Sequence, residues 1–186
     1  MTLRAIGIDT ALIIIDLQQG TAKNPFIHPI GGVIENASKL VTVFRRHQFP
    51  VVFISFRPNA RPSRNDSIKT GAQEAPVDFL SPLPALHPAP GDILIEKTTW
   101  SAFAGTELDP ILKERGITRL VLAGVATSIG VESSARAAYD LGYGLVVVSD
   151  AITDLRRETH DNSLERVFPI IAEIGLTVDV IGAFED

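Results

Sequence analysis

The stretch ALIIID at residues 11–16 decides how the rest of this chain is interpreted. It is a run of apolar residues, rich in β-branched isoleucine, that ends in the carboxylate of Asp16. A short, continuously apolar run of this kind is typical of a strand buried on both faces of a parallel sheet. We therefore expect Asp16 to lie where this strand leaves the sheet.

Further runs of the same kind recur along the chain and alternate with segments of helical periodicity. They predict five more strands, at 50–55, 92–95, 119–123, 144–148 and 177–181. Apolar residues at a spacing of three to four predict helices over 33–48, 108–115, 130–141 and 160–174. Repeated β–α units of this kind predict a doubly wound α/β sandwich.

Length and composition restrict the class of protein further. With 186 residues, the chain is expected to form a single domain over 1–186. The net charge of -5, without any Lys/Arg-rich run, argues against a nucleic-acid partner. No apolar run approaches the roughly 18 to 20 residues of a membrane helix, and the N-terminal residues lack a signal-peptide cleavage pattern. We therefore expect a cytoplasmic protein without a membrane partner.

Cysteine is absent from the sequence. This absence excludes disulfides, thiolate metal sites and a cysteine nucleophile.

Residues 57–91 interrupt the alternation of strands and helices. The segment is rich in proline and polar residues and has little helical periodicity. Long irregular loops inside compact domains are often functional, so one interpretation is a lid near the active site. A tolerated surface insertion is the other interpretation, and the sequence favours neither.

Polar residues at the predicted strand ends are the first candidates for a functional site, because ligands of open α/β sheets bind beyond the carboxyl ends of the strands. Asp16 ends the first strand, Lys97 ends the third, and the turn 124–130 follows the fourth. Each residue alone has an ordinary structural explanation: a cap for Asp16, and a solvated ion pair with Glu96 for Lys97. Their joint occurrence needs another explanation.

Together these segments resemble the isochorismatase-like (cysteine hydrolase) superfamily. The resemblance rests, in order and spacing, on DLQQ at 16–19, EKTTWSAF at 96–103 and GVATSIGVESSARAAYDLG at 124–142. It extends to SDAIT at 149–153 and to Thr159-His160 with Ser163-Leu164. It implies a three-layer α/β/α fold with a six-stranded parallel sheet, commonly assembled into homodimers or homotetramers, and a small-molecule substrate. We expect no cofactor.

The resemblance also implies a catalytic set of Asp16, Lys97 and the residue at position 130. In most relatives that third position carries a nucleophilic cysteine, whereas this chain has Gly130. True isochorismatases are similar to this chain in that respect, and they cleave a vinyl ether without covalent catalysis. The resemblance therefore implies that Asp16 acts as a general acid, with Lys97 and the helix end at Gly130 binding charge.

Asp16 and Lys97 impose opposite demands on that mechanism. Donation of a proton by Asp16 requires its pKa to lie above the usual value near 3.9, as burial would provide. A neighbouring ammonium group, such as that of Lys97, lowers the pKa of a carboxyl group. The sequence does not show which effect is larger.

Several residues are expected to line the substrate pocket. Trp100 would form an aromatic wall, Phe26 lies early in the loop after Asp16, and Gln18 belongs to the first block. Ala126 follows a peptide bond, Val125–Ala126, that the resemblance implies to be cis. Thr99 stands where isochorismatases carry an arginine, so Arg57, or less favourably Arg61 or Arg64, is expected to supply that charge.

Other polar residues give weaker signals. Ser128, Ser133 and Ser134 have no histidine partner in the same block, which argues against a serine hydrolase. The four histidines are scattered and lack the Asp-x-His pattern of zinc-binding relatives, so we expect no metal: His28, His47, His87 and His160.

Three functional hypotheses follow. The first is non-covalent hydrolysis of a small carboxylated substrate, an isochorismate-type vinyl ether, to pyruvate and a diol. The second is a catalytically silent homologue that binds a small molecule, which a pocket filled by Trp100 or Phe26 would favour. The third is an amidase-type cysteine hydrolase in which Gly130 replaces the cysteine.

Overall fold

The computed structural model describes residues 3–58, 76 and 78–184. Its six strands are β1 (Thr10–Ile15), β2 (Val51–Phe56), β3 (Ile93–Lys97), β4 (Arg119–Val125), β5 (Gly144–Thr153) and β6 (Glu173–Gly175). Its α-helices are α1 (Ile30–Arg46), α2 (Leu108–Glu114), α3 (Glu132–Asp140), α4 (Arg157–Asn162), α5 (Phe168–Ile171) and α6 (Thr177–Gly182). Shorter helices are η1 (Thr21–Lys23), η2 (Pro84–Leu86), η3 (Thr127–Val131) and η4 (Ser163–Val167), of which η3 and η4 are π-helical.

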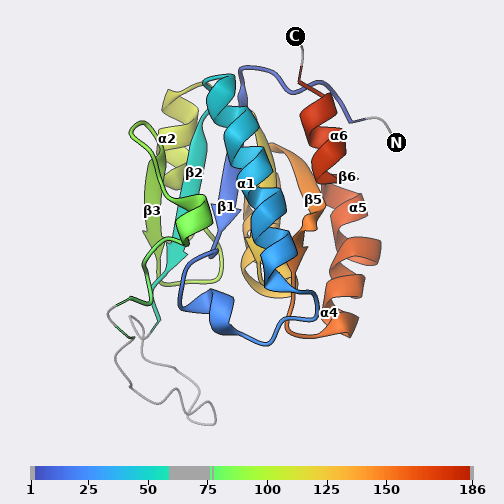
Figure 1. The fold of residues 1–186 in the computed structure, drawn as a ribbon. Coiled ribbons are helices and arrows are strands. Elements are labelled where there is room, and N and C mark those ends of the chain that lie inside the picture. Colours follow the sequence, from blue (N-terminus) through green and yellow to red (C-terminus); the bar gives the residue numbers. More distant parts are fainter. Residues whose placement is uncertain (1–2, 59–75, 77, 185–186) are drawn as a thin grey trace.

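The strands form one parallel sheet in the order β3-β2-β1-β4-β5-β6 (Figure 1). The chain builds the sheet outward from β1 in one direction and then returns to its other side with β4. The order of the strands therefore reverses between β1 and β4, and the crevice beyond their carboxyl ends is where such folds bind ligands. The predicted α/β sandwich with a six-stranded parallel sheet is confirmed.

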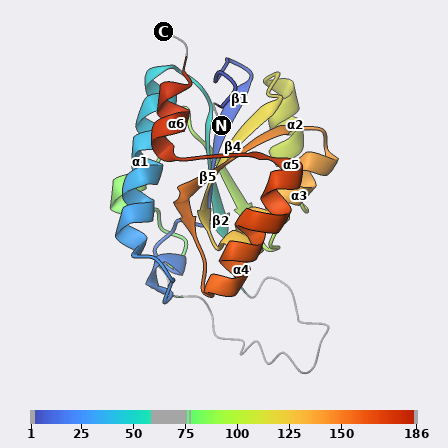
Figure 2. The same cartoon turned by 90° about the vertical axis from the view of Figure 1, so that its right-hand side faces the viewer.

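Helices cover both faces of the sheet (Figure 2), and alternate residues of the central strands pack against the two helical layers. Leu12 and Ile14 of β1 belong to a cluster with α1 and α6, whereas Ile13 and Ile15 belong to a cluster with α2, α3 and α5. All six residues of β1 are buried, which explains why its sequence is continuously apolar.

The longest helix, α1, shows how the helical periodicity of the sequence corresponds to burial. Its buried residues recur at intervals of three or four and form one face: Val33, Ala37, Leu40, Val41 and Phe44. This spacing presents a continuous apolar stripe to the sheet.

The prediction for the C-terminal segment was wrong. Residues 177–181, predicted as a strand, form α6, and the sixth strand is β6 instead. The predicted helix over 160–174 is divided into α4, η4 and α5, which ends at Ile171.

Local hydrogen bonds explain the error. The carboxylate of Asp179 accepts a hydrogen bond from the Leu176 N–H at 2.8 Å, and Asp150 accepts one from the Thr177 N–H at 2.7 Å. These bonds satisfy N–H groups at the beginning of α6 and stabilise a helix there. Burial follows a spacing of three, with Thr177 and Val180 buried and Val178 exposed, so the β-branched composition did not decide the structure.

Part of the proline-rich segment packs against the sheet edge and α1. Leu86 of η2 is fully buried, and the Gln19 N–H donates to the Ser81 carbonyl at 3.0 Å. The remainder of the predicted lid, with Arg61 and Arg64, lies outside the described residues.

Gly124 allows β4 to approach β1 closely near the carboxyl ends of these two strands. It has φ +131°, and a Cβ built there would lie 2.0 Å from the Ile15 carbonyl oxygen. Only glycine fits a backbone that needs both this φ and this contact.

Substitution of Gly124 by alanine should therefore destabilise the fold. We expect Gly124→Ala to lower the free energy of unfolding by at least about 2 kcal/mol, because the new methyl group meets backbone atoms. Urea unfolding followed by circular dichroism measures this change. Gly32→Ala is the control, because Gly32 lies in α1 with open space around it. Equal stability of the two variants would contradict the explanation.

Candidate active site

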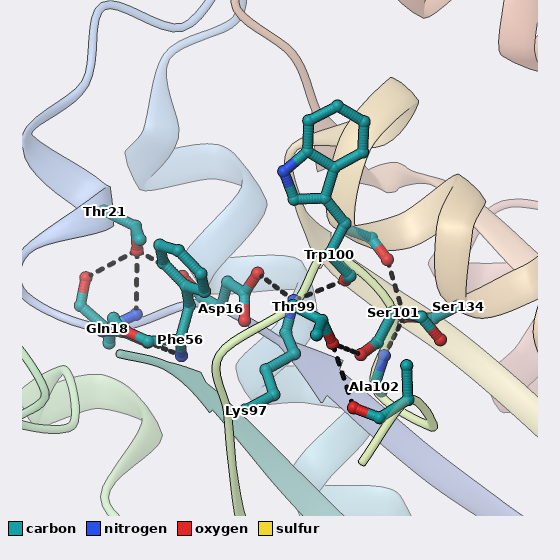
Figure 3. Close-up of polar contacts among 12 residues, drawn as sticks. Asp16, Gln18, Thr21, Phe56, Lys97, Thr99, Trp100, Ser101, Ala102 and Ser134 are labelled. Carbon is teal, nitrogen blue, oxygen red and sulfur yellow. Dashed lines mark hydrogen bonds and ion pairs between the residues drawn. The ribbon is translucent and has the colours of Figure 1, made fainter. Parts of the chain in front are cut away.

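The carboxyl ends of β1 and β3 bring Asp16 and Lys97 together (Figure 3), and the segment after β4 adds Gly130 beside Asp16. Asp16 directly follows β1, Lys97 ends β3, and Gly130 lies in η3, which follows β4. β2 separates β1 from β3 in the sheet, so the Lys97 side chain extends across Phe56. The Lys97 Nζ atom lies 5.6 Å from the centre of the Phe56 ring. This reach allows Lys97 to contact Asp16.

Asp16 and Lys97 form a buried ion pair. The distance from Lys97 Nζ to Asp16 Oδ2 is 2.8 Å, and the two side chains are 1% and 10% exposed. Lys97 Nζ also donates to the Trp100 carbonyl at 2.6 Å. The other carboxyl oxygen, Asp16 Oδ1, is buried and has no hydrogen-bond partner among the residues that the structure describes.

Burial dominates the protonation of Asp16. It raises the pKa of this carboxyl group from its usual 3.8 to about 6, although the charge and the hydrogen bond of Lys97 lower the pKa. The opposing demands recognised in the sequence are therefore resolved in favour of desolvation. A carboxyl with this pKa carries a proton below about pH 6.

Gly130 lies against the acid. A Cβ built at Gly130 would be 2.9 Å from Asp16 Oδ2 and 2.9 Å from the Val125 carbonyl oxygen. Both distances are shorter than ordinary van der Waals contacts of a Cβ atom, so a side chain at this position would displace its neighbours. Glycine lets the helix backbone approach the carboxyl group directly.

Buried polar groups fix the first turn of η3. Asp154 accepts a hydrogen bond from the Ser128 N–H at 2.6 Å, and Thr127 Oγ1 lies 2.9 Å from His160 Nδ1. Burial lowers the pKa of His160, and the neighbouring His28 adds to the effect. Neutral His160 therefore stabilises this turn as an ordinary hydrogen-bond partner.

The Asp16 carboxyl group faces a cavity of about 260 Å³ at the mouth of the crevice. The cavity is lined by most of the predicted site residues, namely Asp16, Lys97, Gly130, Ala126, Trp100 and Phe26. The Val125–Ala126 peptide bond is cis, as predicted. Trp100 remains 64% exposed, so its ring borders the cavity without filling it.

Two predicted substrate-binding residues do not line this cavity. Arg57 forms a bidentate ion pair with Glu96 at 2.5 and 2.7 Å, on the exposed side of the sheet edge. Glu96 thus pairs with Arg57 and not with Lys97. The Gln18 amide is hydrogen-bonded to the backbone of Phe56 and Phe79, so it does not point into the cavity.

Other cavity residues were not predicted from the sequence: Thr21, Asn24, Phe56, Phe79, Val125, Ile129 and Leu155. Phe56 could have been found, because it directly follows the strand predicted at 50–55 and therefore lies at the carboxyl edge of the sheet. Phe79 gave no signal, because its proline-rich surroundings have no periodicity.

Two kinds of feature are absent from the described residues. No three His, Asp or Glu side chains gather there as a metal ion would require. No helix in the described part of the chain has the length and apolar composition needed to cross a membrane.

The raised pKa of Asp16 predicts a specific pH dependence of stability. Between about pH 4 and 6 the folded state keeps a proton on Asp16 that the unfolded state has lost, so the free energy of unfolding should fall as pH rises. The full effect corresponds to about 3 kcal/mol. Urea unfolding of wild type and Asp16→Asn across pH 4–7 measures it, and the Asp16 carboxyl ¹³C resonance should titrate near pH 6. If the free energy of unfolding of wild type instead rose with pH relative to that of Asp16→Asn, the charge of Lys97 would have a larger effect on the pKa of Asp16 than burial has.

The sequence and structure were compared with known proteins. The model of the isochorismatase domain matches residues 10–179. The uncharacterized isochorismatase family protein YwoC of Bacillus subtilis is 38% identical over 177 residues, which cover 92% of each chain.

Solved structures give the same result. An isochorismatase family protein from Burkholderia thailandensis has a TM-score of 0.84 at 34% identity, covering 97% of this chain and 98% of that one. N-carbamoylsarcosine amidase from Thermoplasma acidophilum has a TM-score of 0.76 at 26% identity, covering 90% and 96%. This chain therefore belongs to the isochorismatase family of hydrolases.

Proposed function

We propose that this protein hydrolyses a small carboxylated vinyl ether of the isochorismate type, without a covalent intermediate. The observation that carries the proposal is the contact between Asp16 and Gly130. A buried acid with a pKa of about 6 lies directly against a residue that has no side chain. The site therefore offers a proton donor and no nucleophile at that position.

Asp16 would begin the reaction by protonating the methylene carbon of the vinyl ether. The resulting oxocarbenium ion takes up water at the ether-bearing carbon, and that water returns a proton to the Asp16 carboxylate. The hemiketal then breaks the bond between its carbon and the oxygen attached to the ring. The proton of the hemiketal hydroxyl group passes to that oxygen, which gives pyruvate and the ring alcohol. The proton count balances, and one water molecule is consumed.

Lys97 would stabilise the charge that this step creates. Its Nζ atom lies 2.8 Å from Asp16 Oδ2 and is in place before the carboxylate forms. A preorganised cation of this kind favours the transition state over the protonated ground state. Two of the three ammonium donors of Lys97 contact Asp16 and Trp100, which leaves one for the substrate.

The helix end at Gly130 supports binding of a substrate carboxylate. Ala126, Ile129 and Gly130 line the cavity at the beginning of the continuous helix formed by η3 and α3. Backbone N–H groups at such an end favour an anion. Gly130 brings this backbone close to Asp16, so the substrate carboxylate and the reacting carbon can lie side by side.

Two alternative functions have less support. N-carbamoylsarcosine amidase, a relative of this chain, acts on another class of substrate, but a thiol at position 130 would need space that Asp16 and the Val125 carbonyl occupy. A silent homologue is disfavoured, because the cavity is open and neither Trp100 nor Phe26 fills it.

Pyruvate release from isochorismate, coupled to lactate dehydrogenase, tests the proposal. We expect Asp16→Asn to lower kcat at least about 100-fold, because the general acid is lost. Wild-type kcat/KM should fall about tenfold per pH unit above pH 6, in line with the pKa of Asp16. Glu96→Gln is the matched control, since it changes a neighbouring carboxylate outside the cavity and should retain activity. Pyruvate release by Asp16→Asn at the wild-type rate would refute the assignment.

The role of Gly130 is tested separately with Gly130→Ala and Gly130→Cys. We expect either side chain to displace Asp16 and to lower pyruvate release about 100-fold, because displacements near 1 Å have effects of this size. Both variants are also assayed on a panel of primary amides. Amide hydrolysis by Gly130→Cys, with no pyruvate from wild type, would identify a cysteine-hydrolase site whose nucleophile has been removed.

A further inference from the structure

We propose that Phe79 is a specificity-determining residue that makes this cavity select a flat, cyclic carboxylate over an acyclic one. The inference rests on the proposed function only in taking the cavity at Asp16 as the substrate site. It concerns recognition of the ring and not the chemistry of bond cleavage.

Aromatic side chains form much of the cavity lining. Phe26, Phe56, Phe79 and Trp100 come from four separate segments and surround the polar groups of Asp16 and Lys97. The volume of about 260 Å³ is below the range usual for drug-sized ligands, so the ligand is small. A small ligand with one planar apolar ring and one anionic group matches these two kinds of surface.

Gln18 holds Phe79 and Phe56 in place. Its Nε2 atom donates to the Phe79 carbonyl at 3.1 Å and to the Phe56 carbonyl at 2.9 Å, and its Oε1 atom accepts from the Phe56 N–H at 2.7 Å. The Gln18 side chain is buried, so this amide is a fixed connection. One side chain therefore sets the positions of two aromatic walls that are far apart in the sequence.

The absence of a side chain at Gly20 leaves the space that the Phe79 ring occupies. A Cβ built at Gly20 would lie 2.1 Å from Cδ2 of that ring, and the Gly20 N–H donates to the Phe79 carbonyl at 3.0 Å. The backbone of Gly20 has φ -67° and ψ -45°, which any residue adopts without strain. The requirement for glycine at position 20 therefore comes from the ring of Phe79 and not from the backbone.

The chain contains a built-in probe for ligand binding. Trp100 is the single tryptophan of the sequence, and it borders the cavity. Its fluorescence can be titrated with benzoate, a planar cyclic carboxylate, and with pyruvate as the acyclic comparison. Wild type should bind benzoate saturably and more tightly than pyruvate.

Removal of the Phe79 ring should abolish this preference. We expect Phe79→Ala to weaken benzoate binding about tenfold, the size of an aromatic contact, and to leave pyruvate binding within about twofold. Equal losses for both ligands, unchanged benzoate binding, or no saturable benzoate binding by wild type would each overturn the inference.

Gly20→Ala provides an independent route to the same ring. It should reproduce the loss seen in Phe79→Ala, and the double variant should bind benzoate no more weakly than either single variant, because both act through one side chain. Gly32→Ala adds the same methyl group in open space and should bind as wild type does. Additive losses in the double variant would show that Gly20 acts elsewhere.

The outcomes separate this inference from the proposed function. Ring selectivity that depends on Phe79, without pyruvate release from isochorismate, would leave the inference intact and refute the vinyl-ether reaction. Pyruvate release with a KM unchanged by Phe79→Ala would support the reaction and refute the role of Phe79.

Discussion

Asp16 and Lys97 meet at 2.8 Å although both are withheld from water, and the rest of the site is arranged around that contact. A buried charge is costly unless it is paired and hydrogen-bonded, so neither residue could keep its place without the other. Lys97 reaches its partner across β2, and the Trp100 carbonyl takes a second of its protons. The same burial that makes the pair costly raises the pKa of Asp16, so this carboxyl group keeps its proton at mildly acidic pH.

The sequence predicted the parts of this arrangement that follow from strand periodicity. The first five strands are short apolar runs, and the parallel order gathers their carboxyl ends at one edge, so Asp16, Lys97 and the turn 124–130 could be placed near one another. The resemblance to the isochorismatase-like superfamily, and not the periodicity, singled out Gly130 as the third residue of the site. The sixth strand was misplaced, because capping bonds from Asp150 and Asp179 favour a helix over residues that have β-branched side chains.

Side-chain partners were harder to predict than backbone positions. Arg57 and Gln18 are polar residues near strand ends, as Asp16 is. Spacing alone does not reveal that Arg57 pairs with Glu96, or that the Gln18 amide bonds to backbone carbonyl and N–H groups. Phe79 enters the cavity from a segment without periodicity, and its position depends on contacts with Gln18 and Gly20. Such contacts depend on three-dimensional packing between segments that are far apart in the sequence.

The hydrogen bonds of Ser134 have a consequence for how this site could evolve. Ser134 Oγ donates to the Gly130 carbonyl at 2.6 Å and accepts from the Ala102 N–H at 2.9 Å, so the helix beside the acid is joined to the loop that carries Trp100. That loop in turn holds Lys97, and Lys97 holds Asp16, which lies against Gly130. These contacts connect Gly130, Ser134, the Trp100 loop, Lys97 and Asp16 in a ring that returns to Gly130. A larger residue at position 130 would therefore require changes in the Trp100 loop and around Asp16 as well, so new chemistry at this site would require several coordinated substitutions.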